Sequence, residues 1–488
     1  MGMRQKDVDK ILELGVLLSS ERDLNRLLEK ILSSVMELTR CDAGTLYLLD
    51  GDSLRFKIMR NDTLGKYEGG DGRDPNLPPV PLDREHVCSL ALLENRTIVV
   101  GDVKNCREYD FSGHLNYDKE MGYDTKSILV VPMRNREGER IGVLQMINAM
   151  DSQGNVCPFP EDTVLLVESV ASQAAITIQN VRYIRAIKGL FQSFVRVMSS
   201  AVDERTPYNG NHTRHMAAYG EKFIDYLNEN ARAKGEKEPF SQEHREELLM
   251  SIWFHDIGKL VTPLEVMNKE SRLSPMERQE FRHRMEIVRL LAKLEHARGE
   301  MTAEEHEKVM DQTREAEAFV EDMDKEGYVT DEKLARLNAL RERTYTGEDG
   351  KAYPWISREE YDMLSIRRGN LSQKERKIME DHVVITDKLL SQIQFSPDLS
   401  HVREWAADHH EALNGTGYPR GKKGQEIPPE VRIITILDIF DALVAEDRPY
   451  KKGKTVEEAL KILMDGAEKG RLDQELTQLF AESRCWQK

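Results

Sequence analysis

The 488-residue chain has few cysteines, no long apolar run and no excess of basic residues. Its five cysteines are scattered without a C-x-x-C pair, which argues against a disulfide framework or a cysteine metal site. No stretch approaches the roughly 18 consecutive apolar residues of a membrane span, and the N-terminus lacks the apolar core of a signal peptide. We therefore expect a cytoplasmic protein without a membrane partner.

The net charge of −16 disfavours a general attraction to nucleic acid, so we expect no nucleic-acid partner. An anionic small substrate is not excluded, but it would need local cations, either metal ions or a few placed Lys and Arg side chains. The length exceeds one ordinary core, and 39% hydrophobic with 32% charged residues is typical of folded domains. We expect two to four domains.

The residue pattern changes along the chain. Helical periodicity covers residues 8–40, and short strand candidates separated by Gly, Asp and Asn turns follow. A loop rich in Gly, Asp and Pro (67–83) lies between two of them, and from about residue 162 the pattern is helical almost throughout. This order predicts an α+β domain followed by an all-α domain. The strand candidates are GTLYLLD, SLRFKIM, TIVVGDV, SILVVPMR and RIGVLQMINA.

A long helix without proline is expected over 162–205, between the two domains. Its apolar residues recur at alternating spacings of four and three, which is typical of a heptad seam. We favour a parallel coiled coil that joins a sensor to an effector in a homodimer, with Asn180 setting the register. A single helix that packs on its own domain is the alternative. The seam consists of Ile176, Asn180, Tyr183, Ile187, Leu190, Phe194, Val197 and Ala201.

Histidine and aspartate gather in suggestive phrases of the second half. His255 and Asp256 are adjacent in SIWFHDIGKL, and His409 and His410 are adjacent in WAADHHEALNG. Neutral imidazoles and carboxylates form the mixed ligand set that divalent transition metals prefer. A bridging Asp can hold two ions that together clamp a phosphoryl group. By spacing alone, a metal site and ordinary histidines remain equally open. Further candidates are His212, His382 and Asp438.

Three long phrases occur in order: HDIGK (255–259), HHEALNGTGYP (409–419) and ILDIFDALVAEDRPYKK (436–452). On these phrases, residues 200–475 resemble an HD-GYP domain, the cyclic di-GMP phosphodiesterase branch of the HD phosphohydrolase superfamily. The resemblance implies a metal-dependent enzyme that hydrolyses cyclic di-GMP to pGpG or GMP. The alternatives are another cyclic dinucleotide, such as cyclic GMP-AMP, as substrate, or a catalytically silent receptor.

The resemblance also implies two divalent transition metal ions per chain, with iron or manganese expected. Asp256 would bridge them and act in catalysis with Lys259, which resembles the family's phosphate-contacting lysine. Some members bind a third metal through a Glu where this chain has Tyr208. Asp441 would support a ligand from outside the site. The implied ligands of the first metal are His212, His255, Asp256 and Asp438, and those of the second are Asp256, His382, His409 and His410.

The implied substrate contacts are cations and the loop that carries the GYP tripeptide. Lys259, Arg448 and Lys451 would offset the phosphate charges, which provides the local cations that an anionic substrate needs. Gly417 would let the backbone approach the substrate. Tyr418 would either contact the nucleotide or pack within the loop.

A segment dense in Glu, Lys and Arg (271–370) interrupts the resemblance and leaves two candidates for the middle histidine, His283 and His382. We favour His382, because the sequence after it runs on into the HHE phrase as it does in the family. The insertion is expected to be a helical elaboration without a catalytic site.

The run VVPMRNREGERIGVLQMINA (130–149) and the helix after it make residues 8–180 resemble a GAF domain, a six-stranded antiparallel sheet flanked by helices. Such domains often hold a small regulatory ligand, whose identity here is unknown. Cyclic-nucleotide-binding members carry an Asn-Lys pattern, but here Ala149 follows Asn148. Cyclic-nucleotide binding and a purely dimerising role therefore both stay open.

Overall fold

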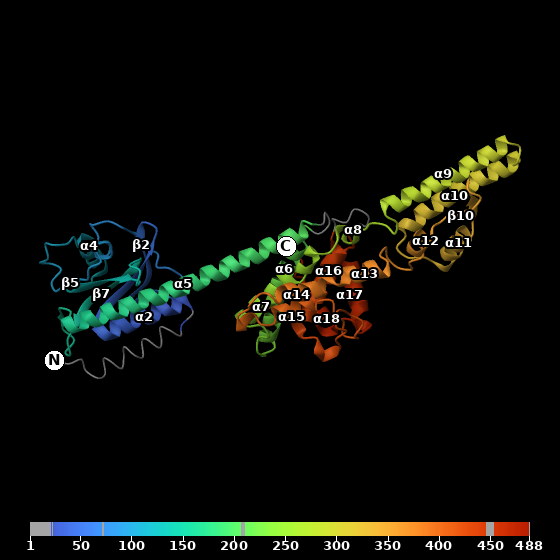
Figure 1. The fold of residues 1–488 in the computed structure, drawn as a ribbon. Coiled ribbons are helices and arrows are strands. Elements are labelled where there is room, and N and C mark those ends of the chain that lie inside the picture. Colours follow the sequence, from blue (N-terminus) through green and yellow to red (C-terminus); the bar gives the residue numbers. More distant parts are fainter. Residues whose placement is uncertain (1–20, 22, 71–72, 206–209, 446–452, 488) are drawn as a thin grey trace. The chain divides into compact units, whose positions relative to one another are not determined.

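The chain divides into two compact units, Met1–Leu190 and Phe191–Lys488, and each is described by itself (Figure 1). The first unit is α+β and the second is almost entirely helical, which confirms the predicted fold class. The computed structural model describes residue 21 and residues 23–70, 73–205, 210–445 and 453–487.

The first unit is built on one antiparallel sheet. Its strands are β1 (Cys41–Asp50), β2 (Ser53–Asn61), β3 (Lys66–Gly69), β4 (Val80–Pro81), β5 (Ile98–Val100), β6 (Ile128–Arg134), β7 (Arg140–Met150) and β8 (Val156–Cys157). The main path runs β3-β2-β1-β7-β6-β5, with β4 beside β2 and β8 beside β7. All five strand candidates are present. Part of the loop predicted at 67–83 is strand instead, because β3 and β4 are held by pairing with β2 rather than by apolar alternation.

Helices cover both faces of the sheet and bury its two sets of side chains. These helices are α2 (Leu24–Thr39), α3 (Val87–Glu94), α4 (Ser112–Met121) and the first half of α5 (Glu161–Asp203). Along β6, Leu129, Val131 and Met133 pack against α2 and α5, whereas Ile128 and Val130 belong to the core on the α3 face. This strict alternation follows from the two-residue period of a strand. Figure 1 shows α2 and α5 lying along the same face.

Asn148, at the end of β7, is buried and adopts a left-handed backbone conformation with φ 60°. Its side-chain oxygen accepts hydrogen bonds from the backbone amides of residues 126–127, at 2.8 and 3.2 Å. Its side-chain nitrogen donates to the Tyr123 hydroxyl (3.1 Å) and to the Asp124 carbonyl (2.9 Å). The amide is thus fully engaged inside the domain, where it ties β7 to the segment that precedes β6.

Replacing Asn148 with Ala should lower the free energy of unfolding of the first unit by about 2–4 kcal/mol, because buried partners lose their hydrogen bonds and Ala disfavours positive φ. Calorimetry of the full chain, with the first unit's transition followed separately, measures this change. Asn155→Ala is the matched control, since Asn155 is exposed. Equal effects of the two substitutions would contradict the assignment.

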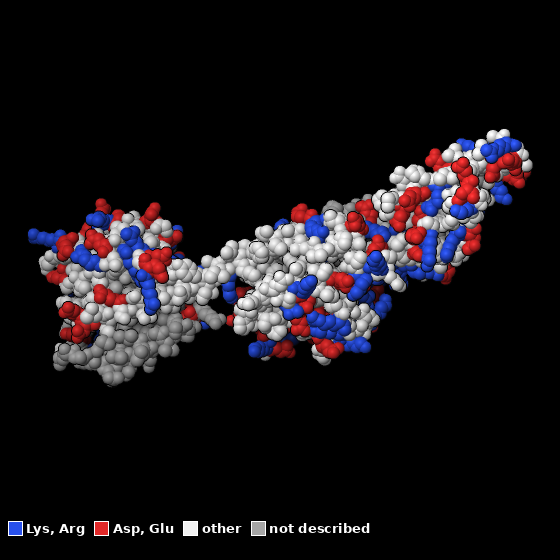
Figure 2. Space-filling view, in the orientation of Figure 1, with Lys and Arg blue, Asp and Glu red and all other residues white. Residues whose placement is uncertain are grey.

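The helix α5 closely matches the predicted range 162–205. One window of it is long and apolar enough to cross a membrane by composition, but 39% of that window is buried in the protein, where Val167 and Ala171 join the sheet core. Farther along α5, the apolar side chains of the predicted seam are exposed in the described structure. Figure 2 shows this stretch of the helix as nearly uncharged on the visible face. Exposed fractions range from 52% at Tyr183 to 72% at Leu190.

The second unit holds the end of α5 and the remaining helices. Its apolar core joins α6, α7, α16, α17 and α18, whose bounds are given below. The elements before the insertion are α6 (His212–Ala233), α7 (Gln242–Phe254), the 3-10 turn η1 (Ile257–Leu260) and α8 (Leu264–Met267). Those after it are α13 (Gln373–Glu380), α14 (His382–Leu390), η2 (Pro397–Leu399), α15 (Val402–Ala407), η3 (Gly424–Glu426), α16 (Pro429–Val444), α17 (Val456–Glu468) and α18 (Gln474–Ser483).

The insertion is helical, as predicted, and has an apolar core of its own. Phe281 and Met285 pack there with Phe319 and Trp355. The fully buried Arg272, near the start of this segment, donates hydrogen bonds to the Met323 carbonyl in its middle and to the Ile366 carbonyl near its end. The elements are α9 (Pro275–Ala297), α10 (Ala303–Lys325), α11 (Asp331–Arg341), the hairpin β9 (Thr344–Thr346) and β10 (Ala352–Pro354), and α12 (Arg358–Leu364).

Candidate metal centre

The seven predicted metal ligands come from five separate segments and converge in the second unit. Most stand at helix ends, where the chain turns: His212 begins α6, His255 directly follows α7, and His382 begins α14. His409 and His410 follow α15. The remaining two are Asp256, which precedes the 3-10 turn η1, and Asp438 within α16.

Two groups of ligand atoms lie on either side of Asp256. His212, His255 and Asp256 form one group, and His382, His409 and His410 form the other, with the ligand atoms of each group within 4.8 Å of one another. Asp256 Oδ2 lies 3.1 Å from His255 Nε2 and 3.8 Å from His212 Nε2. Its Oδ1 faces the second group, 3.4 Å from His382 Nε2 and 4.0 Å from His409 Nε2.

Three of these histidines share one orientation. His255, His382 and His409 each place Nδ1 next to the backbone carbonyl three residues earlier, at 2.7, 2.6 and 2.8 Å. A carbonyl only accepts hydrogen bonds, so Nδ1 must carry the proton and Nε2 presents its lone pair inward. All three Nε2 atoms, and Asp256 Oδ1, are buried without a hydrogen-bond partner. Unpaired buried acceptors facing one point are what a bound cation would satisfy.

The carboxylate groups of the site stabilise positive charge on the side chains beside them. Burial alone would raise the pKa of Asp256, but His255 and the ammonium group of Lys259 beside it hold that pKa well below its usual value. Burial likewise opposes a proton on His212, yet its hydrogen bonds with Asp438 and Asp441 raise the pKa of His212 to about 10. The distances are 3.3 Å from His212 Nε2 to Asp438 and 2.6 Å from Nδ1 to Asp441. Asp441 thus contacts a predicted ligand from outside the group.

The second group is held neutral instead. Burial lowers the pKa of His382 to about 4 and keeps the pKa of His409 well below its ordinary value, with the neighbouring His410 adding to the effect. Burial also lowers the pKa of His410. Neutral imidazole is the form that binds a metal ion, so these three side chains are prepared as ligands at neutral pH.

Sequence reasoning missed the residues that join the two groups. The Gly258 backbone packs against His382, and a β-carbon there would stand 1.9 Å from the His382 carbonyl oxygen. Thr386 accepts a hydrogen bond from the Gly258 amide (3.0 Å) and donates one to the His255 carbonyl (3.1 Å). Gly258 belongs to the HDIGK phrase and could have been found from it, whereas nothing in the sequence marks Thr386.

The predicted substrate-binding residues differ in what the structure shows of them. Lys259 Nζ lies 2.5 Å from Asp256 Oδ2, so its ammonium group neutralises the buried carboxylate. The Tyr418 ring lies 4.8 Å from that of His410. A β-carbon on Gly417 would stand 2.3 Å from the Ala412 backbone nitrogen, so close packing within the loop already requires a glycine there. Tyr208, Arg448 and Lys451 lie outside the described residues.

The structure also separates the two candidates for the middle histidine. His382 lies in the second group, while His283 is exposed on α9 of the insertion.

Comparison with known families covers both units. Residues 23–178 match the GAF domain family, and residues 359–476 match the HD domain family. The chain combines a GAF domain with an HD domain. The match to the HD domain begins near the end of the insertion, so it includes the second histidine group and Asp438 but not the first group. The first group lies before the insertion in sequence, and the structure brings it next to the second group in space.

Characterised relatives share only part of the chain. A cyclic di-GMP phosphodiesterase of Thermotoga maritima is 42% identical over 100 residues, which are 20% of this chain and 27% of that protein. A 3′3′-cGAMP-specific phosphodiesterase of Vibrio cholerae is 42% identical over 95 residues, 20% of each chain. The match thus spans about a quarter of these relatives or less. A solved GAF domain/HD domain protein from Geobacter sulfurreducens aligns at 15% identity and a TM-score of 0.25, over 34% of this chain and 98% of that one.

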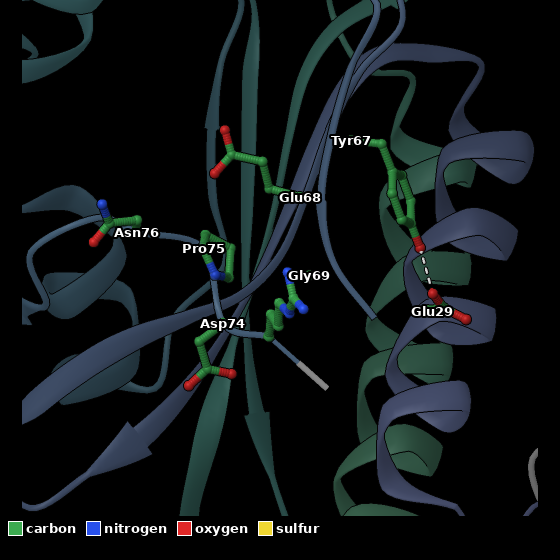
Figure 3. A pocket seen from close by; sticks show the side chains of 8 residues that line it. Glu29, Tyr67, Glu68, Gly69, Asp74, Pro75 and Asn76 are labelled. Carbon is green, nitrogen blue, oxygen red and sulfur yellow. Dashed lines mark hydrogen bonds between the residues drawn. The ribbon is translucent and has the colours of Figure 1, made fainter. Parts of the chain in front are cut away.

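The GAF domain carries a surface pocket of about 380 Å³ beside β3 and α2 (Figure 3). Three of its eight lining residues carry a carboxylate, but two of these already have partners: Glu29 accepts from the Tyr67 hydroxyl (2.8 Å) and Asp74 pairs with Lys57 (2.5 Å). The pocket therefore does not identify a ligand, and a regulatory ligand for this domain stays a prediction.

The low pKa of His382 predicts how the metal-free protein responds to acid. The unfolded chain takes up a proton below about pH 6.5, whereas folded His382 does so only near pH 4. Stability should therefore fall as pH drops through this window and stay constant above it, with His382 contributing up to about 3 kcal/mol. His382→Gln should flatten that fall in denaturant titrations of chelator-treated protein, and exposed His283→Gln should not. Identical slopes for both variants would refute the assignment.

Proposed function

We propose that the HD domain is a metal-dependent phosphodiesterase that hydrolyses cyclic di-GMP. The observation that carries the proposal is Asp256, which is buried between two histidine groups, with the Nε2 atoms of His255, His382 and His409 buried there without a hydrogen-bond partner. Relatives that match 20% and 23% of this chain are named a cyclic di-GMP phosphodiesterase and a cyclic di-GMP phosphodiesterase response regulator. Mixed histidine and carboxylate sites of this kind are suited to phosphoryl chemistry.

Two divalent ions, iron or manganese, fit the donor set. The first would be held by His212, His255, Asp256 and Asp438, and the second by Asp256, His382, His409 and His410. Bound ions of this kind activate water and offset phosphate charge. A bridging role for Asp256 is supported by its two oxygens, which face different groups.

Hydrolysis adds water across one phosphodiester, breaks a bond between phosphorus and a 3′ oxygen, and yields linear pGpG; a second hydrolysis yields GMP. The chain's own part is to hold charges in fixed places. Asp256 and Asp438 stay ionised at neutral pH, because nearby histidines hold both pKa values below the ordinary range despite burial. Lys259 supplies a buried ammonium beside them that can turn to a phosphate oxygen. Arg448 and Lys451 are proposed as further phosphate contacts, and Gly417 and Tyr418 as parts of the substrate loop.

Cyclic GMP-AMP is the second candidate substrate, because a relative of equal identity is named as specific for it. Assays of both dinucleotides with manganese or anaerobic ferrous iron, with metal content quantified, separate the two. Turnover with about two metals per chain is expected. Full metal loading without turnover of either substrate would overturn the enzyme and favour a silent receptor.

Asp256→Asn should lower turnover at least about a hundredfold and reduce metal content, because even residues outside the ligand shell contribute ten- to hundredfold. The variant keeps the side-chain shape but loses the charge that both groups share. Asp465→Asn, an exposed change in the same unit, is the matched control and should leave both quantities unaltered. Normal turnover by the Asp256→Asn variant would sink the proposed centre.

The GAF domain is proposed to regulate the HD domain within a homodimer formed through α5. Support comes from the exposed stripe Tyr183, Ile187, Leu190, Phe194 and Val197, whose spacing is that of a heptad seam. Apolar side chains at such spacing gain by pairing with a second copy of the helix. A cytoplasmic location is supported by the five cysteines, all unpaired, as a reducing compartment requires.

Leu190→Glu should convert this dimer to a monomer at micromolar concentration, because it places a charge on the apolar stripe of each copy. Sedimentation velocity measures the shift in mass. Gln192→Glu introduces the same residue on the side of the helix away from the stripe, because residues two apart do not share a helix face, and it should leave the dimer intact. If the wild-type chain sediments as a monomer, α5 does not dimerise.

A further inference from the structure

The last turns of α5 are part of the HD unit's own core. Val195 and Val202 are buried there, with Met250 and Phe254 of α7 and Ile257 of η1. His255 and Asp256 lie between these two elements, and Lys259 lies within η1. The first half of the same helix is buried in the GAF core, so α5 contributes to both cores. The end of α5 is thus packed directly beneath the candidate metal centre.

Polar contacts strengthen this attachment at two points. The Ser199 hydroxyl donates to the Trp253 carbonyl at 2.5 Å, two residues before His255. Asp203, the last residue of α5, accepts hydrogen bonds from the backbone amide (3.2 Å) and the hydroxyl (2.9 Å) of Thr213. Thr213 directly follows His212. The helix end therefore touches the neighbours of two predicted ligands.

Arg205 makes the most specific contact. Its guanidinium donates to the carbonyl oxygens of Lys259 (2.6 Å), Leu260 and Thr262 (3.2 Å). Lys259 and Leu260 end the η1 turn and Thr262 follows it, so Arg205 adds a side-chain donor at the end of this turn. The Lys259 carbonyl also accepts from the Thr262 amide (3.2 Å). The planar fork of an arginine can reach several acceptors at once, which a lysine cannot do. Arg205 thereby binds the end of the turn that begins after Asp256 and carries Lys259.

We propose that Arg205 is a positioning residue for the phosphodiester hydrolysis, and that through it the geometry of Lys259 depends on the end of α5. This inference rests on the proposed function. A displacement of the last turn of α5 moves the η1 turn through Arg205 and the start of α6 through Asp203. Regulation from the GAF domain then has a defined endpoint, which is the placement of Lys259 relative to Asp256.

The test is a double-mutant cycle on turnover of cyclic di-GMP. Arg205→Ala should lower kcat about ten- to hundredfold, the effect of a misplaced catalytic group, with KM changed less than about threefold. In a Lys259→Met background the same substitution should have little further effect, because its action passes through Lys259. Arg205→Lys keeps the charge but not the fork, so it should recover only part of the loss. Arg185→Ala, at an exposed arginine of α5, should leave kcat unchanged.

Hydrogen exchange provides a readout that does not depend on turnover. Arg205→Ala should speed exchange of the amides in residues 257–262 while the other core helices keep their protection. Multiplicative effects of the two substitutions, or unchanged exchange in this turn, would overturn the role of Arg205. If the wild-type chain hydrolyses no cyclic dinucleotide, the proposed function fails. The exchange result still decides whether Arg205 holds the η1 turn in place.

Discussion

The second unit is organised around one buried negative charge. Asp256 is ionised although it is almost inaccessible to water, and an isolated carboxylate in such a place would be strongly destabilising. The ammonium group of Lys259 compensates this charge, and the imidazole rings of the two histidine groups surround the rest of the Asp256 carboxylate. The helix ends that deliver those imidazoles must therefore meet at this point. Gly258 and Thr386 make that meeting possible by letting η1 and α14 touch through their backbones.

The protein resolves the charge problem in two different ways on the two sides of Asp256. On one side, Asp438 and Asp441 attract a positive charge onto His212. On the other, burial excludes charge from His382 and His409. The first side therefore places a positive charge beside extra carboxylates, whereas the second side presents neutral nitrogen donors. In the proposed metal centre, this asymmetry would give the two positions different affinities for a given metal, since ligand charge is a main determinant of binding.

Much of this could be predicted from local sequence. HDIGK and HHEALNGTGYP mark the ligand doublets, and the heptad spacing marks α5, because these signals lie within a few residues of one another. Continuity with the HHE phrase predicts His382 rather than His283 as the middle histidine, and the structure places His382 beside Asp256. What local sequence could not reveal are contacts between distant segments, such as Thr386 with Gly258 and Arg205 with Lys259. The strands β3 and β4 were missed for the same reason, since β2 holds them in place.

The insertion has a consequence for how the unit folds. Lys269 and Glu375, which form an ion pair at 2.7 Å, are separated by 106 residues of sequence. Closing so long a flexible loop would be entropically unfavourable and slow. Inside the insertion, however, Arg272 near its start donates to the Ile366 carbonyl near its end, which draws its two ends together. The Gly369 amide donates to the Gly327 carbonyl in its middle. Once that segment has formed around its own core, the chain before and after it behaves as though joined by a short turn. The hundred added residues then impose only a small topological penalty on assembling the two halves of the centre.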